Sequence, residues 1–144
     1  MEEHRGSRAV AILTRVPLMM VTVIFTLIAF RYLTDPVRAA SAAGIIFISP
    51  GGVTVARVGF AAFPLAFGAI ALSCLLSPRR VLDGLYMVLI LIGIVIVVRL
   101  LGMALEHSTE TAKLLMPEGI LAALSIVGVR LERARRRRER PDVS

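Results

Sequence analysis

Long apolar runs separated by short polar segments make up most of this chain. A helix needs roughly 20 mostly apolar residues to cross a hydrocarbon core that is about 30 Å thick. Four stretches meet this requirement and predict membrane-spanning helices at about 10–33, 58–76, 81–105 and 112–131. We therefore expect an all-α protein, a membrane-embedded four-helix bundle.

Proline and glycine mark the breaks between these runs. Asp35-Pro36 predicts the end of the first helix, because the residue before a proline is disfavoured in the α conformation. Ser49 to Gly52 predicts a turn ahead of the second helix, and Ser77 to Arg80 predicts a hairpin after it. Pro64 predicts a kink in the second helix. Pro117-Glu118 interrupts the fourth run, although this pair is also typical of a helix start.

The segment 37–49 is moderately apolar but too short to span a bilayer. We predict that it is a short interfacial or re-entrant segment. The chain is then one membrane domain, 1–131, followed by a basic tail, 132–144. A cleavable signal peptide ending near Ala40-Ser41-Ala42 is the alternative for the first helix. Its apolar run is too long for that, and two charged residues separate the run from the site.

Composition agrees with a lipid environment. Hydrophobic residues make up 57% of the chain and charged residues 19%, too few charges to cover a soluble domain of this size. The single cysteine, Cys74, excludes an internal disulfide and indicates a small buried side chain. We expect no metal or cofactor, since Glu106, His107 and Glu110 are typical of an exposed polar loop.

Orientation follows from the basic residues. With four spans, the N-terminus, the Arg79-Arg80 hairpin and the C-terminal tail share one side. That side carries 12 of the 17 Lys and Arg residues. The positive-inside rule therefore places both termini in the cytoplasm.

Seven arginines lie between Arg130 and Arg140, and we expect them to continue the fourth helix, with Glu132 and Arg136 at helical spacing. Next to a membrane such a run attracts anionic lipids. The predicted lipid contacts are Arg135, Arg136, Arg137 and Arg138. Nucleic-acid binding is disfavoured, because no aromatic residues accompany the basic ones.

Two charges fall inside the apolar runs and need a reason, because a charge in the bilayer centre costs about 2.5–3.5 kcal/mol on insertion scales. Arg99 lies six residues before the end of the third helix. Glu118 lies about six residues after the start of the fourth. Both are then roughly 9 Å below the outer surface, which predicts a buried ion pair. The alternatives are that Arg99 extends to the interface and that Glu118 caps a helix.

Arg57 and Arg31, at the outer ends of the second and first helices, extend this hypothesis to an outward-facing polar pocket. Two arginines facing one carboxylate leave an excess positive charge, which suits an anionic head group or a carboxylate ligand. The candidate ligand-binding residues are Arg57, Arg99, Glu118 and Arg31.

Small residues recur at three- or four-residue spacing along the second helix and form one face: Gly59, Ala62, Ala66, Ala69 and Ser73. Such a face allows close contact between helices. We favour packing within the chain over contact between copies in a homo-oligomer.

Five short motifs resemble those of a known family. They are Phe-Arg-Tyr-Leu-Thr-Asp-Pro at 30–36, Arg-Val-Gly-Phe at 57–60, Ala-Phe-Gly at 66–68, Val-Arg-Leu-Leu-Gly at 98–102 and Pro-Glu at 117–118. Their order and spacing resemble an uncharacterised family of small bacterial four-helix membrane proteins, the domain of unknown function four-three-four-five, whose layout is loosely DoxX-like. The resemblance implies a multi-pass protein of the bacterial inner membrane. It carries over no activity.

Three functions follow from this organisation. The leading one is a non-enzymatic accessory or binding component of the membrane that acts as a homo-oligomer. The second is a small transporter or channel subunit with Arg57, Arg99 and Glu118 along an anion or proton path. The third is a membrane enzyme, or an enzyme's partner, that binds a lipid or quinone head group in the same pocket.

Overall fold

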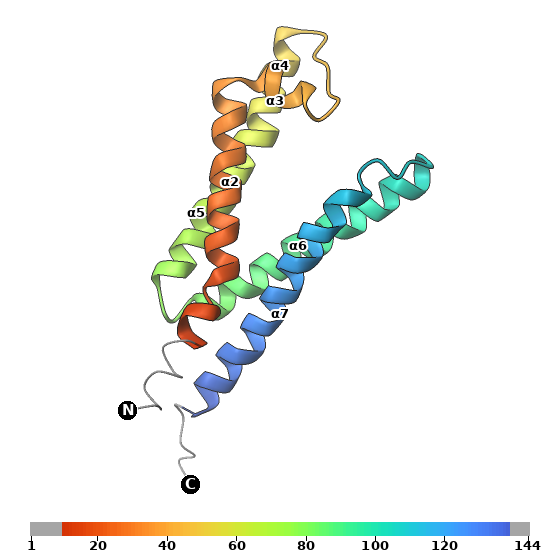
Figure 1. The fold of residues 1–144 in the computed structure, drawn as a ribbon. Coiled ribbons are helices and arrows are strands. Elements are labelled where there is room, and N and C mark those ends of the chain that lie inside the picture. Colours follow the sequence, from red (N-terminus) through yellow and green to blue (C-terminus); the bar gives the residue numbers. More distant parts are fainter. Residues whose placement is uncertain (1–9, 139–144) are drawn as a thin grey trace. The chain divides into compact units, whose positions relative to one another are not determined.

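The computed structural model describes residues 10–138, and these form helices and their connections with no strand (Figure 1). Within this range, four helical stretches are long and apolar enough to cross a membrane: Val10–Thr34, Pro50–Leu76, Val81–Leu105 and Ala112–Arg138. The predicted all-α fold with four spans is therefore confirmed. Of the basic residues used to predict orientation, Arg5, Arg8 and Arg140 lie outside the described residues.

The chain divides into two compact units. The first, here the α2–α5 unit, comprises Met19–Ser73. The second, here the α6–α7 unit, comprises the described residues 10–18 and 74–138.

In the α2–α5 unit, α2 (Val16–Thr34) follows helical residues 10–13 and ends before Asp35, as predicted. Asp35 caps the short helix α3 (Pro36–Ser41), since its carboxylate accepts the backbone N–H of Arg38 at 3.1 Å. The predicted segment 37–49 thus begins with this helix. Its interfacial or re-entrant character stays a prediction.

The second span begins earlier than the sequence predicted. Helix α4 (Pro50–Arg57), the π-helix η1 (Val58–Ala62) and α5 (Phe63–Leu76) follow one another without a break. The Ser49 hydroxyl accepts the N–H of Gly52 at 3.2 Å, and Pro50 occupies the first helical position. Serine as N-cap with proline next to it starts a helix. The predicted start at 58 is therefore wrong.

The irregularity expected at Pro64 is a widened turn. The N–H of Phe63 bonds to the carbonyl of Val58, five residues back, at the end of η1. Proline has no N–H, and in a regular α-helix its ring crowds the carbonyl four residues earlier. The π turn just before Pro64 gives the backbone room to adapt while the helix continues.

A close approach at Gly68 joins α5 to α2 in this unit. A Cβ there would lie 3.5 Å from Phe25 Cβ and 3.6 Å from the carbonyl oxygen of Thr22. The rings of Phe25 and Phe67 meet edge to face, with 6.4 Å between centroids. These are ordinary van der Waals distances, so the two helices pack closely at position 68 with room for no more than a small side chain.

The small residues predicted to form the packing face are exposed instead: Gly59, Ala62, Ala66, Ala69 and Ser73. The buried small residues of the same span are Ala56, Ala61, Gly68 and Ala71, besides Cys74. Ala61, Gly68 and Ala71 also recur at helical spacing, on roughly the opposite face of the helix. The prediction that the first set packs within the chain is not met in the α2–α5 unit.

In the α6–α7 unit, α6 (Val81–Leu105) has the predicted bounds, and α7 (Leu115–Arg138) runs back along it after the 3₁₀ turn η2 (Ala112–Leu114) (Figure 1). Pro117 does not interrupt α7. It is the third residue of the helix, where the backbone N–H groups lack intrahelical partners in any case. The helix also continues past the predicted end at 131, as expected for the arginine-rich segment.

The tightest packing in this unit is at Gly84 of α6. A Cβ at this position would lie 2.6 Å from the Cβ of Cys74 and 2.9 Å from Leu18 Cδ2. Leu18 is fully buried and Cys74 is buried as a free thiol. Cys74 therefore acts as a small core residue, as its apolar surroundings predicted.

We predict that Gly84→Ala destabilises the protein, because the new methyl group collides with the immobile Cys74 Cβ. Overpacking of this kind costs about 1–3 kcal/mol. Gly93→Ala on the same helix is the matched control, since nothing lies within 4 Å of a Cβ there. Unfolding of both variants in detergent would measure the difference, and equal stability would contradict the close approach.

Candidate functional site

Arg99 of α6 and Glu118 in the first turn of α7 form an ion pair. The Nε of Arg99 donates to both carboxylate oxygens of Glu118, at 3.1 Å and 3.0 Å, and its Nη2 donates to Oε1. A guanidinium that presents two nitrogens to one carboxylate makes the strong, orientation-specific form of this interaction. The predicted ion pair is confirmed.

Both partners lie at a similar depth along their helices. Arg99 is six residues, or about 9 Å, from the end of α6. Glu118 follows three residues of 3₁₀-helix and three of α7, which amounts to about 10 Å. The two side chains are only 19% and 12% exposed. Each charge in an apolar region is therefore neutralised by the other, and the place of Glu118 in the first turn also suits the helix dipole.

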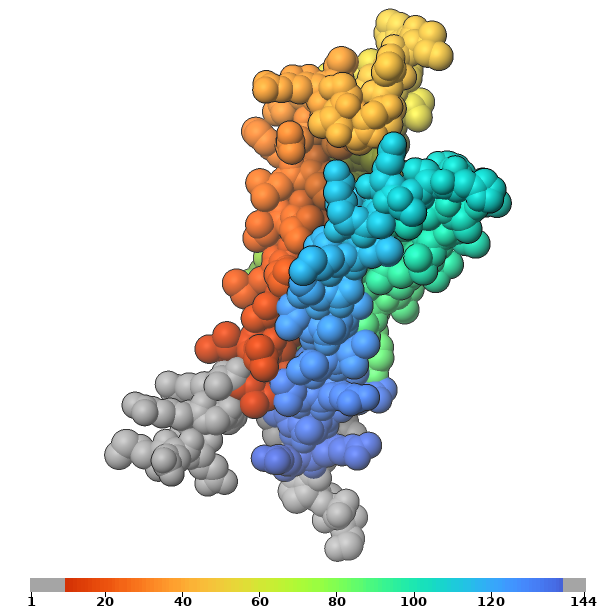
Figure 2. Space-filling model, turned by 45° about the vertical axis from the view of Figure 1, so that its right-hand side comes forward, coloured from red at the N-terminus to blue at the C-terminus, as the bar shows by residue number. Residues whose placement is uncertain are grey.

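Arg57 belongs to the α2–α5 unit, where it lines a pocket of about 640 Å³. The pocket is open on one side and is lined by α3, the loop 42–49 and α4; Figure 2 shows this part of the chain, in yellow, projecting from its unit. Its walls are mainly apolar: Val37, Ile45, Ile46, Phe47, Ile48, Pro50 and Val53. The Arg57 side chain has no hydrogen-bond or ion-pair partner among residues 10–138, in contrast to Arg99.

Arg31 lines a second, smaller pocket of about 230 Å³ in the same unit, together with Thr34, Asp35 and Arg38. The sequence thus grouped four residues that the structure divides into three settings. Arg99 and Glu118 pair with each other, whereas Arg57 and Arg31 line separate pockets. The hypothesis that all four residues line one pocket stays a prediction.

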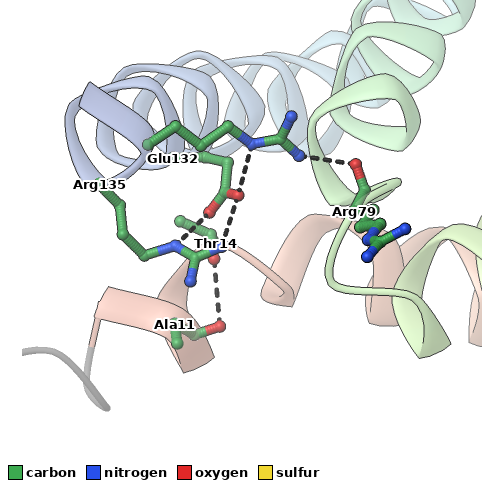
Figure 3. Close-up of polar contacts among 6 residues, drawn as sticks. Ala11, Thr14, Arg79, Glu132 and Arg135 are labelled. Carbon is green, nitrogen blue, oxygen red and sulfur yellow. Dashed lines mark hydrogen bonds and ion pairs between the residues drawn. The ribbon is translucent and has the colours of Figure 1, made fainter. Parts of the chain in front are cut away.

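Glu132, which the sequence places at helical spacing from Arg136, is a buried acid near the end of α7. Glu132 is 1% exposed. Its carboxylate accepts bonds from Arg135 at 2.8 and 3.0 Å and from Arg136 at 3.0 Å (Figure 3). Arg136 also donates to the carbonyl of Arg79 at 2.7 Å, which ties α7 to the α5–α6 connection.

The burial of Glu132 could have been predicted from the sequence. The buried face of α7 runs through Leu121, Ser125 and Gly128 at helical spacing, and the next position on that face is Glu132. Treating 132 as the start of a tail hid this continuity. An acid on the buried face that is followed by arginines three and four residues later predicts ion pairs between them.

The polar loop after α6 has a structural explanation. His107 has a φ of 50°, and the N–H of Ser108 bonds to the carbonyl of Met103 at 3.2 Å. This six-to-one bond is the pattern that closes a helix when the residue after it is left-handed. Glu106, His107 and Glu110 are all exposed.

Comparison of the chain with protein-family models, curated proteins and solved structures found no match in any of the three. The class supported by the fold is therefore the broad one, a multi-pass membrane protein built from four apolar helices.

We predict that Arg99→Glu lowers stability by about 3–5 kcal/mol, because it leaves two like charges facing each other in a nonpolar region. Adding Glu118→Arg re-forms the pair in reverse and should recover more than half of the loss. Thermal unfolding in detergent measures both effects.

The matched control for this rescue is Arg99→Glu with Glu106→Arg. This second change restores the net charge at an exposed position just after α6. It should rescue nothing. If both double variants recover equally, the Arg99–Glu118 contact is not the source of the stability.

Proposed function

We propose that the protein is a non-enzymatic binding component of the membrane whose α3–α4 pocket takes an amphiphile with an anionic head group. The observation that carries this proposal is the position of Arg57, whose guanidinium has no partner among residues 10–138 and lies at a pocket with apolar walls. Pockets that bind small molecules are of this size, mostly apolar, with a few polar groups that fix orientation.

The other polar groups of the pocket are engaged in local bonds. The Ser49 hydroxyl caps α4, Ser41 donates to the Arg38 carbonyl at 3.0 Å, and the Thr54 hydroxyl lies 3.5 Å from the Pro50 carbonyl. Arg57 is therefore the polar side chain of the pocket whose N–H donors have no partner among residues 10–138. A carboxylate or phosphate accepts two parallel bonds from such a fork, and the apolar walls suit a hydrocarbon chain.

Topology supports an outward-facing pocket. The connection between the first two spans contains α3 and the loop 42–49. With successive spans crossing in alternate directions, this connection is opposite the side that holds Arg79, Arg80 and the tail. The positive-inside rule makes that basic side the cytoplasmic one. The proposed location is a bacterial inner membrane, which rests on the family resemblance.

The transporter and enzyme alternatives make different predictions from the same reconstituted protein. A transporter gives ion or proton flux that disappears with Glu118→Gln. An enzyme carries a cofactor, or forms a lipid product, that mass spectrometry detects. Because the Nε and Nη2 of Arg99 both donate to the Glu118 carboxylate in the structure, we rank binding ahead of both.

We predict that dodecyl phosphate binds the detergent-solubilised protein and that Arg57→Gln weakens this binding roughly tenfold or more. The reason is that hydrogen bonds to charged groups are worth about 1.5–3 kcal/mol. Native mass spectrometry with increasing ligand measures the affinity, with dodecyl maltoside as the neutral detergent.

Arg38→Gln is the matched control, because it removes the same charge from the same unit but from the smaller pocket. It should leave binding within about twofold of wild type, well short of the loss for Arg57. Equal losses for the two variants would point to general charge attraction and contradict a site at Arg57.

A further inference from the structure

Two sets of arginines can be distinguished near the end of α7 by their contact with Glu132, and the exposed Arg138 belongs to neither. Arg135 and Arg136 flank this buried acid and bond to it, and Arg136 also reaches the Arg79 carbonyl. The guanidinium groups of Arg135 and Arg136 thus form their hydrogen bonds within the protein. They are among the four residues first expected to contact lipid.

A second set faces outward. Arg130, Arg133 and Arg137 are exposed and are separated by three and four residues. At about 100° per residue they fall within an arc of roughly 60°, and each is at least about 100° from Glu132. They form an exposed stripe along α7, here called the outer arginine stripe, with Arg133 at the border of the buried face.

The middle member of the stripe is held in place. The guanidinium of Arg133 lies over the ring of Tyr86 on α6, 5.4 Å from its centroid. A cation stacked on an aromatic face keeps its N–H groups pointing outward in the guanidinium plane. Arg130 and Arg137 have no hydrogen bond or ion pair within residues 10–138.

The stripe also lies at a suitable depth. Counting from Ala112, with three 3₁₀ residues and then α-helix, Arg130 is about 28 Å and Arg137 about 39 Å along the axis. The hydrocarbon core is about 30 Å thick and its polar layers lie beyond it. The stripe therefore extends from the edge of the core through the layer of lipid head groups.

We propose that Arg130, Arg133 and Arg137 form a binding site for the phosphate groups of anionic phospholipids on the tail side of the membrane. Phosphate oxygens accept the paired N–H groups that arginine presents. Lipid is favoured over nucleic acid because the stripe starts inside a membrane-spanning helix, at head-group depth. Arg135 and Arg136 instead hold α7 to the α5–α6 connection.

The full chain in nanodiscs of equal phosphatidylglycerol and phosphatidylcholine tests this proposal. Native mass spectrometry counts the lipids that remain bound to the ejected protein. Wild type should retain phosphatidylglycerol in clear excess. The variant Arg130→Gln/Arg133→Gln/Arg137→Gln should lose most of it, since each basic residue near an anionic surface contributes about a fivefold preference.

The control is Glu132→Gln/Arg135→Gln/Arg136→Gln, which removes the internally bonded set. It should unfold more easily but keep the phosphatidylglycerol excess, whereas the stripe variant should keep its melting temperature. Two results would overturn the proposal. One is an unchanged lipid ratio in the stripe variant, and the other is an equal loss in the control. Loss of oligonucleotide binding by the stripe variant with no change in lipid ratio would assign the stripe to nucleic acid instead.

Discussion

The hydrocarbon core of a bilayer offers no hydrogen-bond partners, and this constraint accounts for most of what the chain does with its polar groups. Backbone groups are satisfied by four long helices. The one guanidinium within the apolar part of α6, Arg99, is matched by Glu118 on the next helix at the same depth. Neither side chain could stay at its position alone without a cost of several kcal/mol.

Partnering also explains which arginines are available for ligands. Arg99 is engaged by Glu118, and Arg135 and Arg136 are engaged by Glu132. Arg57 at its pocket and the outer arginine stripe are the cationic groups from which we derive binding. The two proposals are independent, because one concerns the α2–α5 unit and the other concerns the α6–α7 unit.

Most of the architecture could be predicted from the sequence because apolar run length is a direct consequence of bilayer thickness. The Arg99–Glu118 pair followed from the same counting of residues along helices. Local choices were harder. Ser49-Pro50 indicates a helix start as well as a turn, and only the bond from Gly52 N–H decides between them. The pairing of Glu132 depended on which face of α7 is buried, and the pocket at Arg57 depends on the path of the loop 42–49.

The central claim is that the chain crosses the membrane four times. The connection between the first two spans, which lines the Arg57 pocket, is then on the opposite side from the arginine-rich end of α7. The claim is tested most directly by labelling single cysteines with a membrane-impermeant maleimide in intact cells that express the protein, with Cys74→Ala as background. The account predicts that Ala43→Cys and Thr109→Cys react from outside and that Ser77→Cys reacts only after permeabilisation. Reaction of Ser77→Cys and Ala43→Cys from the same side would contradict it.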